Sequence, residues 1–214
     1  MYKLALFDMD GTLLDGRTIF YLAETFGFVD ELDYFINSTM EPFEKTIEIA
    51  KLLKDVKKDE ILSCYRKISF RPGVEKLIKS LREKNIILAI ATDSYDLVAN
   101  DVKQRLGFDF AFANNLLFHD SICTGDVVLH NSTKLIDETT NKIYSISKST
   151  VLKNLCQKHH INLSESIAVG DGLVDCGMLA MSGLGVAVFT SDRVKRCADI
   201  STDDLLDIIS YIDW

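Results

Sequence analysis

Two aspartates, Asp8 and Asp10, follow the apolar run at residues 4–7 and stand directly before a Gly11-Thr12 turn. An apolar run that ends in polar residues and a turn is typical of a buried strand that reaches the edge of its sheet. Residues i and i+2 of a strand project to the same side, so both carboxylates are expected to face one pocket. Two like charges at close range are costly unless a cation or a shared proton holds them. The pair predicts a metal or acid–base site, although an Asp-Gly pair can also simply begin a turn.

Further polar residues stand where a predicted strand gives way to a loop or a helix. They are Thr92 with Asp93, Lys148, and Asp171 with Asp175. An apolar run at residues 86–91 precedes the first of these groups, a predicted strand at residues 166–169 precedes the last, and the lysine opens a predicted helix. Ligands of an open parallel sheet bind beyond the carboxyl ends of its strands, so these side chains should gather at one edge. Taken singly, they could equally be a turn threonine, a surface lysine and aspartates that cap a helix.

The composition is that of a folded protein with an acidic balance. Hydrophobic residues make up 47% of the 214 residues, charged residues 26%, and the net charge is −8. This charge disfavours a nucleic-acid partner, and a phosphorylated substrate would need local help from a metal or a basic residue. No apolar stretch approaches the roughly 20 residues of a membrane span, and the N-terminus has no signal-peptide pattern. We expect a cytoplasmic protein with no nucleic-acid or membrane partner; its oligomeric state is left open.

The five cysteines are odd in number and scattered along the chain without a C-x-x-C motif. That usage favours small buried thiols of a reducing compartment over a disulfide framework or a zinc site. The four histidines also lack ligand spacing, so a histidine metal site is not expected.

Strands and helices alternate from residue 71 onward, whereas residues 19–65 have the pattern of helices alone. Continuous apolar strands are typical of a parallel sheet that is covered on both faces. The predicted fold is therefore α/β, with a doubly wound, mainly parallel, Rossmann-like sheet. We assign residues 1–14 and 71–214 to a catalytic core and residues 15–70 to a small helical cap inserted after the first strand.

The ordered motifs resemble those of the haloacid dehalogenase superfamily, and within it the phosphoserine phosphatase branch. The superfamily motifs are Asp8-Met9-Asp10-Gly11-Thr12, Thr92, Lys148 and Gly170-Asp171-Gly172-Leu173-Val174-Asp175. The likeness to the branch rests on Phe110-Ala111-Phe112-Ala113-Asn114, Thr124-Gly125-Asp126-Val127 and Ile161-Asn162-Leu163. The resemblance spans nearly the whole chain and implies phosphoryl-transfer chemistry on the fold of that superfamily.

The resemblance implies that Asp8 is the nucleophile and forms an aspartyl-phosphate. Asp10 would protonate the leaving oxygen and later deprotonate the attacking water. Mg²⁺ is the implied cofactor, because it prefers hard oxygen ligands. The Asp8 and Asp171 carboxylates and the Asp10 backbone carbonyl would bind it, and Asp175 would orient Asp171 or a water on the metal.

The resemblance also implies how the phosphate is held. The Thr92 hydroxyl and neighbouring backbone N–H groups, including that of Asp93, would bind phosphate oxygens, and Lys148 would neutralise their charge. Relatives usually have glycines after this threonine, so the Asp93 side chain must point away from the phosphate. They also have an asparagine where this chain has Val174, which loses one polar contact.

Two cap positions depart from the branch. In phosphoserine phosphatases, a cap glutamate binds the substrate amine and a cap arginine binds the substrate carboxylate. These two positions correspond to Arg17 and Ile49 in this chain. Removing such a charged contact typically costs about 2–5 kcal/mol when it is buried. We therefore expect a small phosphorylated metabolite other than phosphoserine as substrate. A different register through the cap, in which Lys45 or Lys51 supplies a cation, would restore phosphoserine.

The predicted function is that of a magnesium-dependent phosphatase that hydrolyses a small phosphomonoester. The alternatives are phosphoserine phosphatase itself and a phosphotransferase that uses the same aspartyl-phosphate, which the motifs do not distinguish from a phosphatase. A non-enzymatic binding module is disfavoured, because binding alone needs no nucleophile paired with an acid. A dehalogenase is disfavoured because it would not need Asp10 or the magnesium ligands.

Overall fold

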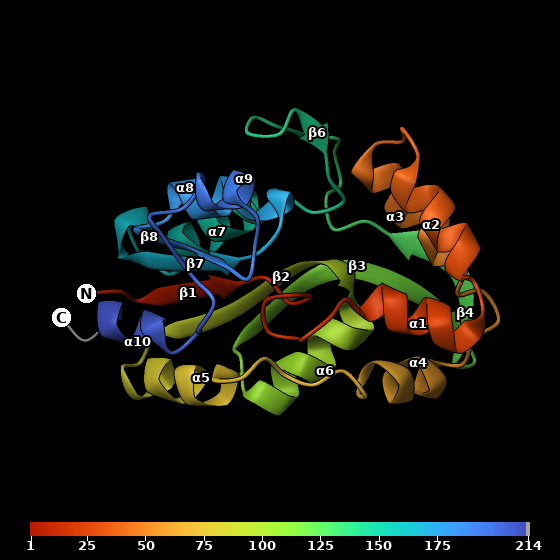
Figure 1. Ribbon diagram of the computed structural model, residues 1–214, viewed down its shortest axis with the longest axis horizontal. Coiled ribbons are helices and arrows are strands. Elements are labelled where there is room, and N and C mark those ends of the chain that lie inside the picture. The colour runs from red at the N-terminus through yellow and green to blue at the C-terminus, as the bar shows by residue number, and fades with distance from the viewer. Residues whose placement is uncertain (213–214) are drawn as a thin grey trace.

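A seven-stranded sheet lies at the centre of the computed structural model, which describes residues 1–212 (Figure 1). The strand order is β4-β3-β2-β1-β7-β8-β9. The strands are β1 (Leu4–Phe7), β2 (Ile87–Tyr95), β3 (Phe110–His119), β4 (Ile122–Val128), β7 (Ser166–Gly170), β8 (Leu184–Val188) and β9 (Ile200–Thr202). Neighbouring strands are parallel except for the antiparallel pair β3–β4. The expected doubly wound, mainly parallel α/β sheet is confirmed.

Helices cover both faces of the sheet (Figure 1). One face carries α5 (Val74–Glu83), α6 (Asp96–Leu106) and α10 (Asp207–Ile212). The other carries α7 (Lys148–Lys158), α8 (Cys176–Met181) and α9 (Asp192–Lys195), with the 3₁₀ turns η1 (Leu163–Glu165) and η2 (Leu173–Asp175). This layering makes every central strand a buried strand, which is why the strands have continuous apolar sequences.

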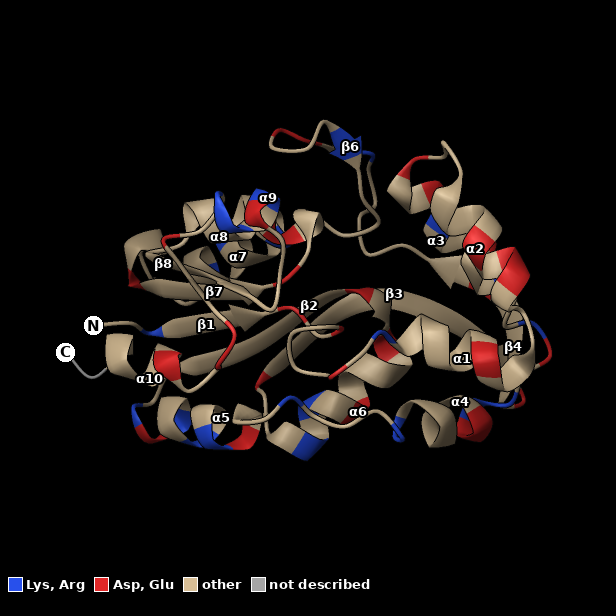
Figure 2. Ribbon diagram, viewed as in Figure 1, with Lys and Arg blue, Asp and Glu red and all other residues tan. Residues whose placement is uncertain are grey.

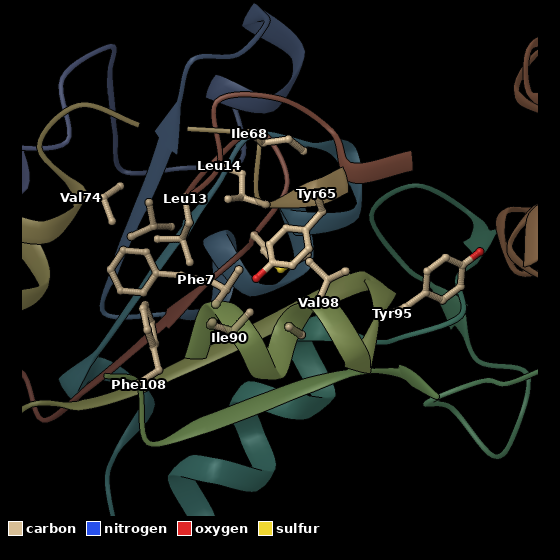
Figure 3. Packing of buried hydrophobic residues seen from close by; sticks show 14 of the residues in the cluster. Phe7, Leu13, Leu14, Tyr65, Ile68, Val74, Ile90, Tyr95, Val98 and Phe108 are labelled. Carbon is tan, nitrogen blue, oxygen red and sulfur yellow. The ribbon is translucent and has the colours of Figure 1, made fainter. Parts of the chain in front are cut away.

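Strand β1 shows how the two faces are filled. Ala5 and Phe7 pack into the core on the α5–α6 side, and Leu4 and Leu6 pack into the core on the α7–α8 side. All are fully buried, so each large side chain contributes about 1.5–3 kcal/mol relative to exposure. The Phe7 ring meets Phe108 edge to face at 5.6 Å, as the close view in Figure 3 shows. The strand that carries the predicted nucleophile at its end is thus fixed from both sides.

Four helices lie between β1 and α5 in the sequence and gather on the right in Figure 1, beside β4. They are α1 (Thr18–Phe26), α2 (Val29–Asn37), α3 (Pro42–Lys51) and α4 (Lys58–Tyr65). Pro42 occupies the first turn of α3, where its missing N–H is tolerated. Tyr65, at the end of α4, is fully buried in the same hydrophobic cluster as Phe7 and so ties these helices to the core (Figure 3). Their separation as a cap at residues 15–70 stays a prediction.

A small hairpin between β4 and α7 was not anticipated from the sequence. It consists of β5 (Ile136–Asp137) and β6 (Lys142–Ile143), and in Figure 1 it rises above the sheet near α3. Its turn is stabilised locally, because the Asp137 carboxylate accepts hydrogen bonds from the Thr139 and Thr140 N–H groups. Ile143 N–H donates to Glu41 Oε2 at 3.0 Å, which joins the hairpin to the start of α3.

Some element bounds differ from expectation. Strand β2 continues to Tyr95, so Thr92 and Asp93 lie within the strand and not after it. The pairing of β2 with β3 is irregular between Ala91 and Tyr95, which lets the strand bend as it leaves the sheet. The hairpin between β3 and β4 turns at Asp120 and Ser121, and both residues have positive φ.

The interpretation of the cysteines was wrong for one pair. Cys176 and Cys197 form a disulfide between residues 21 positions apart in the sequence, with their Cα atoms separated by 5.1 Å. No pattern in the sequence indicated this pair, because neither cysteine belongs to a spaced motif and pairing depends on the tertiary fold. Cys64, Cys123 and Cys156 are free and buried, as expected. The cytoplasmic location stays a prediction.

Surface charge of both signs is spread over the helices. In Figure 2, Asp and Glu colour much of α2, whereas Lys and Arg are mixed with acidic residues along α5. Among the described residues, no helix combines the length and apolar character that crossing a membrane would require.

Candidate active site

The turn after β1 brings the two leading aspartates into one cavity. Asp8 N–H donates to Val169 O of β7 at 2.9 Å, which continues the sheet pairing up to the aspartate. Gly11 then turns the chain with φ of +87°. A Cβ there would lie 2.6 Å from Asp171 Oδ2, so only glycine fits both the backbone conformation and the space. Asp8 and Asp10 both line the resulting cavity, whose volume is about 270 Å³.

Lys148 connects two of the predicted aspartates from the first turn of α7. Its ammonium donates to Asp8 Oδ1 at 2.5 Å and to Asp175 Oδ1 at 2.6 Å, and the residue is 1% exposed. Burial lowers the pKa of Lys148, but the charges of Asp175 and Asp8 outweigh it and the pKa is raised overall. The lysine is therefore a permanent cation beside Asp8. The Ser147 side chain accepts from Thr150 N–H and fixes the start of the helix.

Three carboxylates form a cluster that could bind a metal. Asp8, Asp171 and Asp175 each place an oxygen within 4.8 Å of the others. Burial, followed by the charges of Asp8 and Asp175, raises the pKa of Asp171 to about 8. Burial also raises the pKa of Asp175 to about 6, although Lys148 acts in the opposite direction. Crowded, desolvated carboxylates of this kind fit a hard divalent cation, which would compensate their charge.

Asp10 has a separate environment. Its Oδ1 accepts hydrogen bonds from Thr18 N–H at 3.1 Å and from the Thr18 hydroxyl at 2.6 Å, at the start of α1. Its carboxylate is not part of the metal-type cluster. Burial raises the pKa of Asp10 to about 7, and the charge of Asp8 adds to the shift. A carboxyl group with this pKa can both give and take a proton near neutral pH.

The end of β2 forms another part of the cavity. Thr92 is fully buried, and its Oγ1 accepts from Ser94 N–H at 3.2 Å, which leaves its hydroxyl proton free for another acceptor. Asp93 is exposed and lines the cavity. Asn114 supports this turn from β3, because its Nδ2 donates to Asp93 O at 2.7 Å and to Ser145 Oγ at 2.9 Å.

The cavity has two dissimilar sides. We call Asp8, Lys148, Asp171 and Asp175 the catalytic floor, and Arg17, Lys45 and Ile49 the cap wall. Lys148 and Thr92 do not line the cavity themselves, because they are buried beneath it. Arg17 Nη2 lies 3.9 Å from Asp171 Oδ2, and Lys45 Nζ donates to Ile36 O at 2.6 Å.

Sequence reasoning did not single out several residues that hold the site in place. Thr12 Oγ1 donates to Asp171 Oδ1 at 3.0 Å, and Thr18 and Asn114 have the contacts described above. Thr12 and Asn114 stand inside quoted motifs, so the motifs carried a signal for them. Thr18 had the weaker signal of a threonine at the predicted start of a helix. The contact between Lys45 and Ile36 could be found only from the tertiary structure.

This arrangement fits phosphoryl transfer. The Asp8 carboxylate lies beside a buried cation and belongs to a carboxylate cluster suited to a metal. Asp10 lies in the same cavity with a pKa near 7. Positive charge around the nucleophile is what a phosphate dianion needs in order to approach a carboxylate.

Comparisons with known proteins agree with this chemistry. The family model of haloacid dehalogenase-like hydrolases matches residues 5–180. The phosphoserine phosphatase of Methanocaldococcus jannaschii is 32% identical, over 98% of this chain and 97% of the relative. The phosphoserine phosphatase of Campylobacter jejuni subsp. doylei is 30% identical, over 99% of this chain and all of the relative.

Solved structures give the same answer. A structure described as a phospho-aspartyl intermediate analogue of phosphoserine phosphatase matches with a TM-score of 0.82 and 30% identity, and the match covers 98% of each chain. The chain is a phosphoric monoester hydrolase, and its Asp8, Asp171 and Asp175 cluster is compatible with a divalent metal. By its motifs, fold and site, the chain belongs to the haloacid dehalogenase-like hydrolases, in the branch that resembles phosphoserine phosphatase.

Proposed function

We propose that the protein is a magnesium-dependent phosphatase that forms an aspartyl-phosphate on Asp8 and that phosphoserine is its substrate. The observation that carries the chemistry is the contact of Lys148 with Asp8 at the base of a cavity that also holds Asp10. A buried cation held against a carboxylate beside a possible proton donor favours catalysis over binding alone, because the cation lowers the repulsion that a phosphate meets as the carboxylate attacks it.

In the first step, the Asp8 oxygen that Lys148 does not contact attacks phosphorus. The Asp8–phosphorus bond forms as the bond from phosphorus to the substrate oxygen breaks, and Asp10 gives its proton to that oxygen. In the second step, Asp10 takes a proton from water, whose oxygen attacks phosphorus and releases Asp8. A pKa near 7 suits Asp10 to both transfers.

The Thr92 hydroxyl and the Asp93 N–H would hold phosphate oxygens during both steps, while Lys148 balances the charge on Asp8. Mg²⁺ would be held by the Asp8 and Asp171 carboxylates and the Asp10 carbonyl, and when bound it would act as a Lewis acid on the phosphoryl oxygens. Asp175 stays in contact with Lys148 at 2.6 Å and positions it.

The choice of phosphoserine rests on the relatives, which are named phosphoserine phosphatase and cover nearly the whole chain. The expectation of a different metabolite, based on Arg17 and Ile49, finds no support in these comparisons. Both residues do line the cavity. We further propose that residues 15–70 act as the cap that closes over a small substrate and keeps bulk water out.

The test is hydrolysis of p-nitrophenyl phosphate and of phosphoserine, with Mg²⁺ and with EDTA, by the wild type and by Asp8→Asn. We expect metal-dependent turnover of both esters by the wild type and none by Asp8→Asn, with Asp33→Asn on α2 as the control. Turnover that persists in Asp8→Asn would contradict the assignment of Asp8 as the nucleophile. Hydrolysis of p-nitrophenyl phosphate but not of phosphoserine would contradict only the proposal that phosphoserine is the substrate.

A further inference from the structure

The cavity contains a carboxylate that the proposed chemistry does not use. Asp93 lines the cavity and is exposed, and across residues 1–212 its carboxylate has no hydrogen bond or ion pair. Its charge nevertheless acts within the site. Burial is the main cause of the raised pKa of Asp10, and the Asp93 charge adds to it. The same charge also raises the pKa of Arg17, after that of Asp171 and against the effect of burial, so Arg17 and Asp93 share one electrostatic environment although no hydrogen bond or ion pair joins them.

A bound phosphate makes this carboxylate unfavourable unless a cation joins it. The Asp93 N–H belongs to the turn that is proposed to hold phosphate oxygens, so its side chain lies near a dianion whenever substrate is present. Repulsion between the carboxylate and the phosphate raises the free energy of the complex, and it grows as the cavity closes and water leaves. A substrate that carries its own positive group would relieve this repulsion.

The helical segment before α5 brings positive charge to the same cavity. Arg17 and Lys45 of the cap wall both line the cavity. The Lys45 ammonium uses one donor on Ile36 O at 2.6 Å, which leaves two of its three donors. Arg17 is 3.9 Å from its nearest carboxylate oxygen, on Asp171, so most of its donors are also available. The cap wall can thus bind an anionic group.

The two sides together match a zwitterion. An amino acid has an ammonium and a carboxylate on one carbon, and the cavity offers an anion on the side of β2 and cations on the side of α1 and α3. Building on the proposed function, we propose that Asp93 binds the ammonium of phosphoserine and that Arg17 and Lys45 bind its carboxylate.

This assignment resolves the departure found in the sequence. Arg17 opposes an ammonium only if the ammonium faces the cap. With the amino acid turned so that its ammonium faces β2, Arg17 instead meets the carboxylate, and the Ile49 position needs no charge. Compared with the arrangement expected for the branch, the same substrate is then bound with its ammonium toward the core and its carboxylate toward the cap.

The experiment uses substrates that differ in one group at a time. Phosphoserine and 3-phosphoglycerate differ by an ammonium in place of a hydroxyl, and phosphoserine and phosphoethanolamine differ by the carboxylate. The kcat/KM of each is measured with Mg²⁺ for the wild type, Asp93→Asn, Arg17→Gln and the control Asp126→Asn, whose site on β4 lies outside the cavity. Ratios of kcat/KM cancel any effect of a variant on the shared phosphoryl chemistry.

We expect Asp93→Asn to lower the preference for phosphoserine over 3-phosphoglycerate by about tenfold or more, because a charge-assisted contact to the ammonium is lost. Arg17→Gln should lower the preference for phosphoserine over phosphoethanolamine by a similar factor and leave the first ratio unchanged. Asp126→Asn should change neither ratio.

The inference is overturned if Asp93→Asn changes the first ratio by less than about threefold while the wild type hydrolyses phosphoserine. In that case the proposed function stands. If the wild type hydrolyses p-nitrophenyl phosphate but prefers 3-phosphoglycerate to phosphoserine, both the inference and the proposed substrate are wrong, and the phosphatase chemistry remains. Absence of turnover of every ester would refute the proposed function itself.

Discussion

The catalytic floor and the cap wall face the same cavity but are built in different ways. On the floor, Lys148 is 1% exposed and contacts both Asp8 and Asp175 at 2.6 Å or less. On the wall, more than half of the Arg17 side chain is exposed and its nearest carboxylate oxygen is 3.9 Å away. Buried groups with several partners fix one geometry, whereas an exposed side chain with one long contact can adapt. The floor is suited to a fixed reaction, and the wall to the choice of substrate.

Among variants that keep Asp8, the largest effect should come from Asp10→Asn, which removes the proposed proton donor without changing the shape of the side chain. We expect kcat for phosphoserine to fall by about 10²–10⁴-fold. p-Nitrophenolate leaves without needing a proton, so a burst of about one equivalent should persist with p-nitrophenyl phosphate. Stopped-flow absorbance measures it.

Because the Asp10 pKa is about 7, the acid is protonated below that pH and loses its proton above it. The wild-type kcat/KM for phosphoserine should therefore fall as the pH rises above about 7, and Asp10→Asn should lose this dependence. Equal loss of the burst and of steady-state turnover in the variant would show that Asp10 does more than transfer protons.

Lys148→Met tests the floor as a structural unit. Removing the cation leaves Asp8 and Asp175 buried without compensation, which should destabilise the protein by about 3–5 kcal/mol. Turnover of p-nitrophenyl phosphate should fall by about 10²–10³-fold. Urea unfolding and steady-state kinetics measure the two effects. Lys153→Met, exposed on the same helix, is the control, and a similar loss of stability there would contradict the role assigned to burial.

Without metal, the stability of the protein should depend on pH because several carboxyl groups of the site repel one another. The folded pKa values of Asp10, Asp171 and Asp175 are raised to about 7, 8 and 6, above ordinary values of about 3.9 in the unfolded chain. The folded state therefore binds more protons between about pH 4 and 8, and the free energy of unfolding decreases as pH rises through that window.

In EDTA, Tm should be several degrees lower at pH 8 than at pH 5. Saturating Mg²⁺ should raise Tm more at pH 8, where the carboxylates are free of protons. Scanning calorimetry at the two pH values, with Asp171→Asn as the comparison, measures this effect. A Tm that rises with pH in EDTA would contradict the raised pKa values.

The smallest effect is expected at the contact between the hairpin and α3. Glu41→Gln weakens the acceptor for Ile143 N–H and removes the charge that lies 3.9 Å from Lys142. Because both side chains are partly exposed, the loss of stability should be under about 1 kcal/mol. Urea unfolding against Glu138→Gln, at the exposed turn of the hairpin, tests this. A loss above about 2 kcal/mol would make this contact as important as the floor.

The difference between floor and wall also explains what the sequence could predict. Asp8 and Asp171 were recognisable because each stands at the end of an apolar segment, and that segment determines the strand. Arg17 and Lys45 lie in a helical block whose orientation depends on tertiary packing, so their charges could be noticed but not placed. The β5–β6 hairpin was missed because two-residue strands have no periodicity, and its turn is held by local hydrogen bonds to the Asp137 carboxylate and carbonyl that leave no pattern in the sequence.

The Cys176–Cys197 disulfide has a consequence for the integrity of the chain. The bond closes a covalent ring that includes α8, β8 and α9 and begins directly after Asp175 of the floor. A protease that cuts one peptide bond between residues 177 and 196 would leave two segments in a single molecule. Without reductant, its mass would equal that of the intact chain plus one water, and only reduction would release the C-terminal fragment.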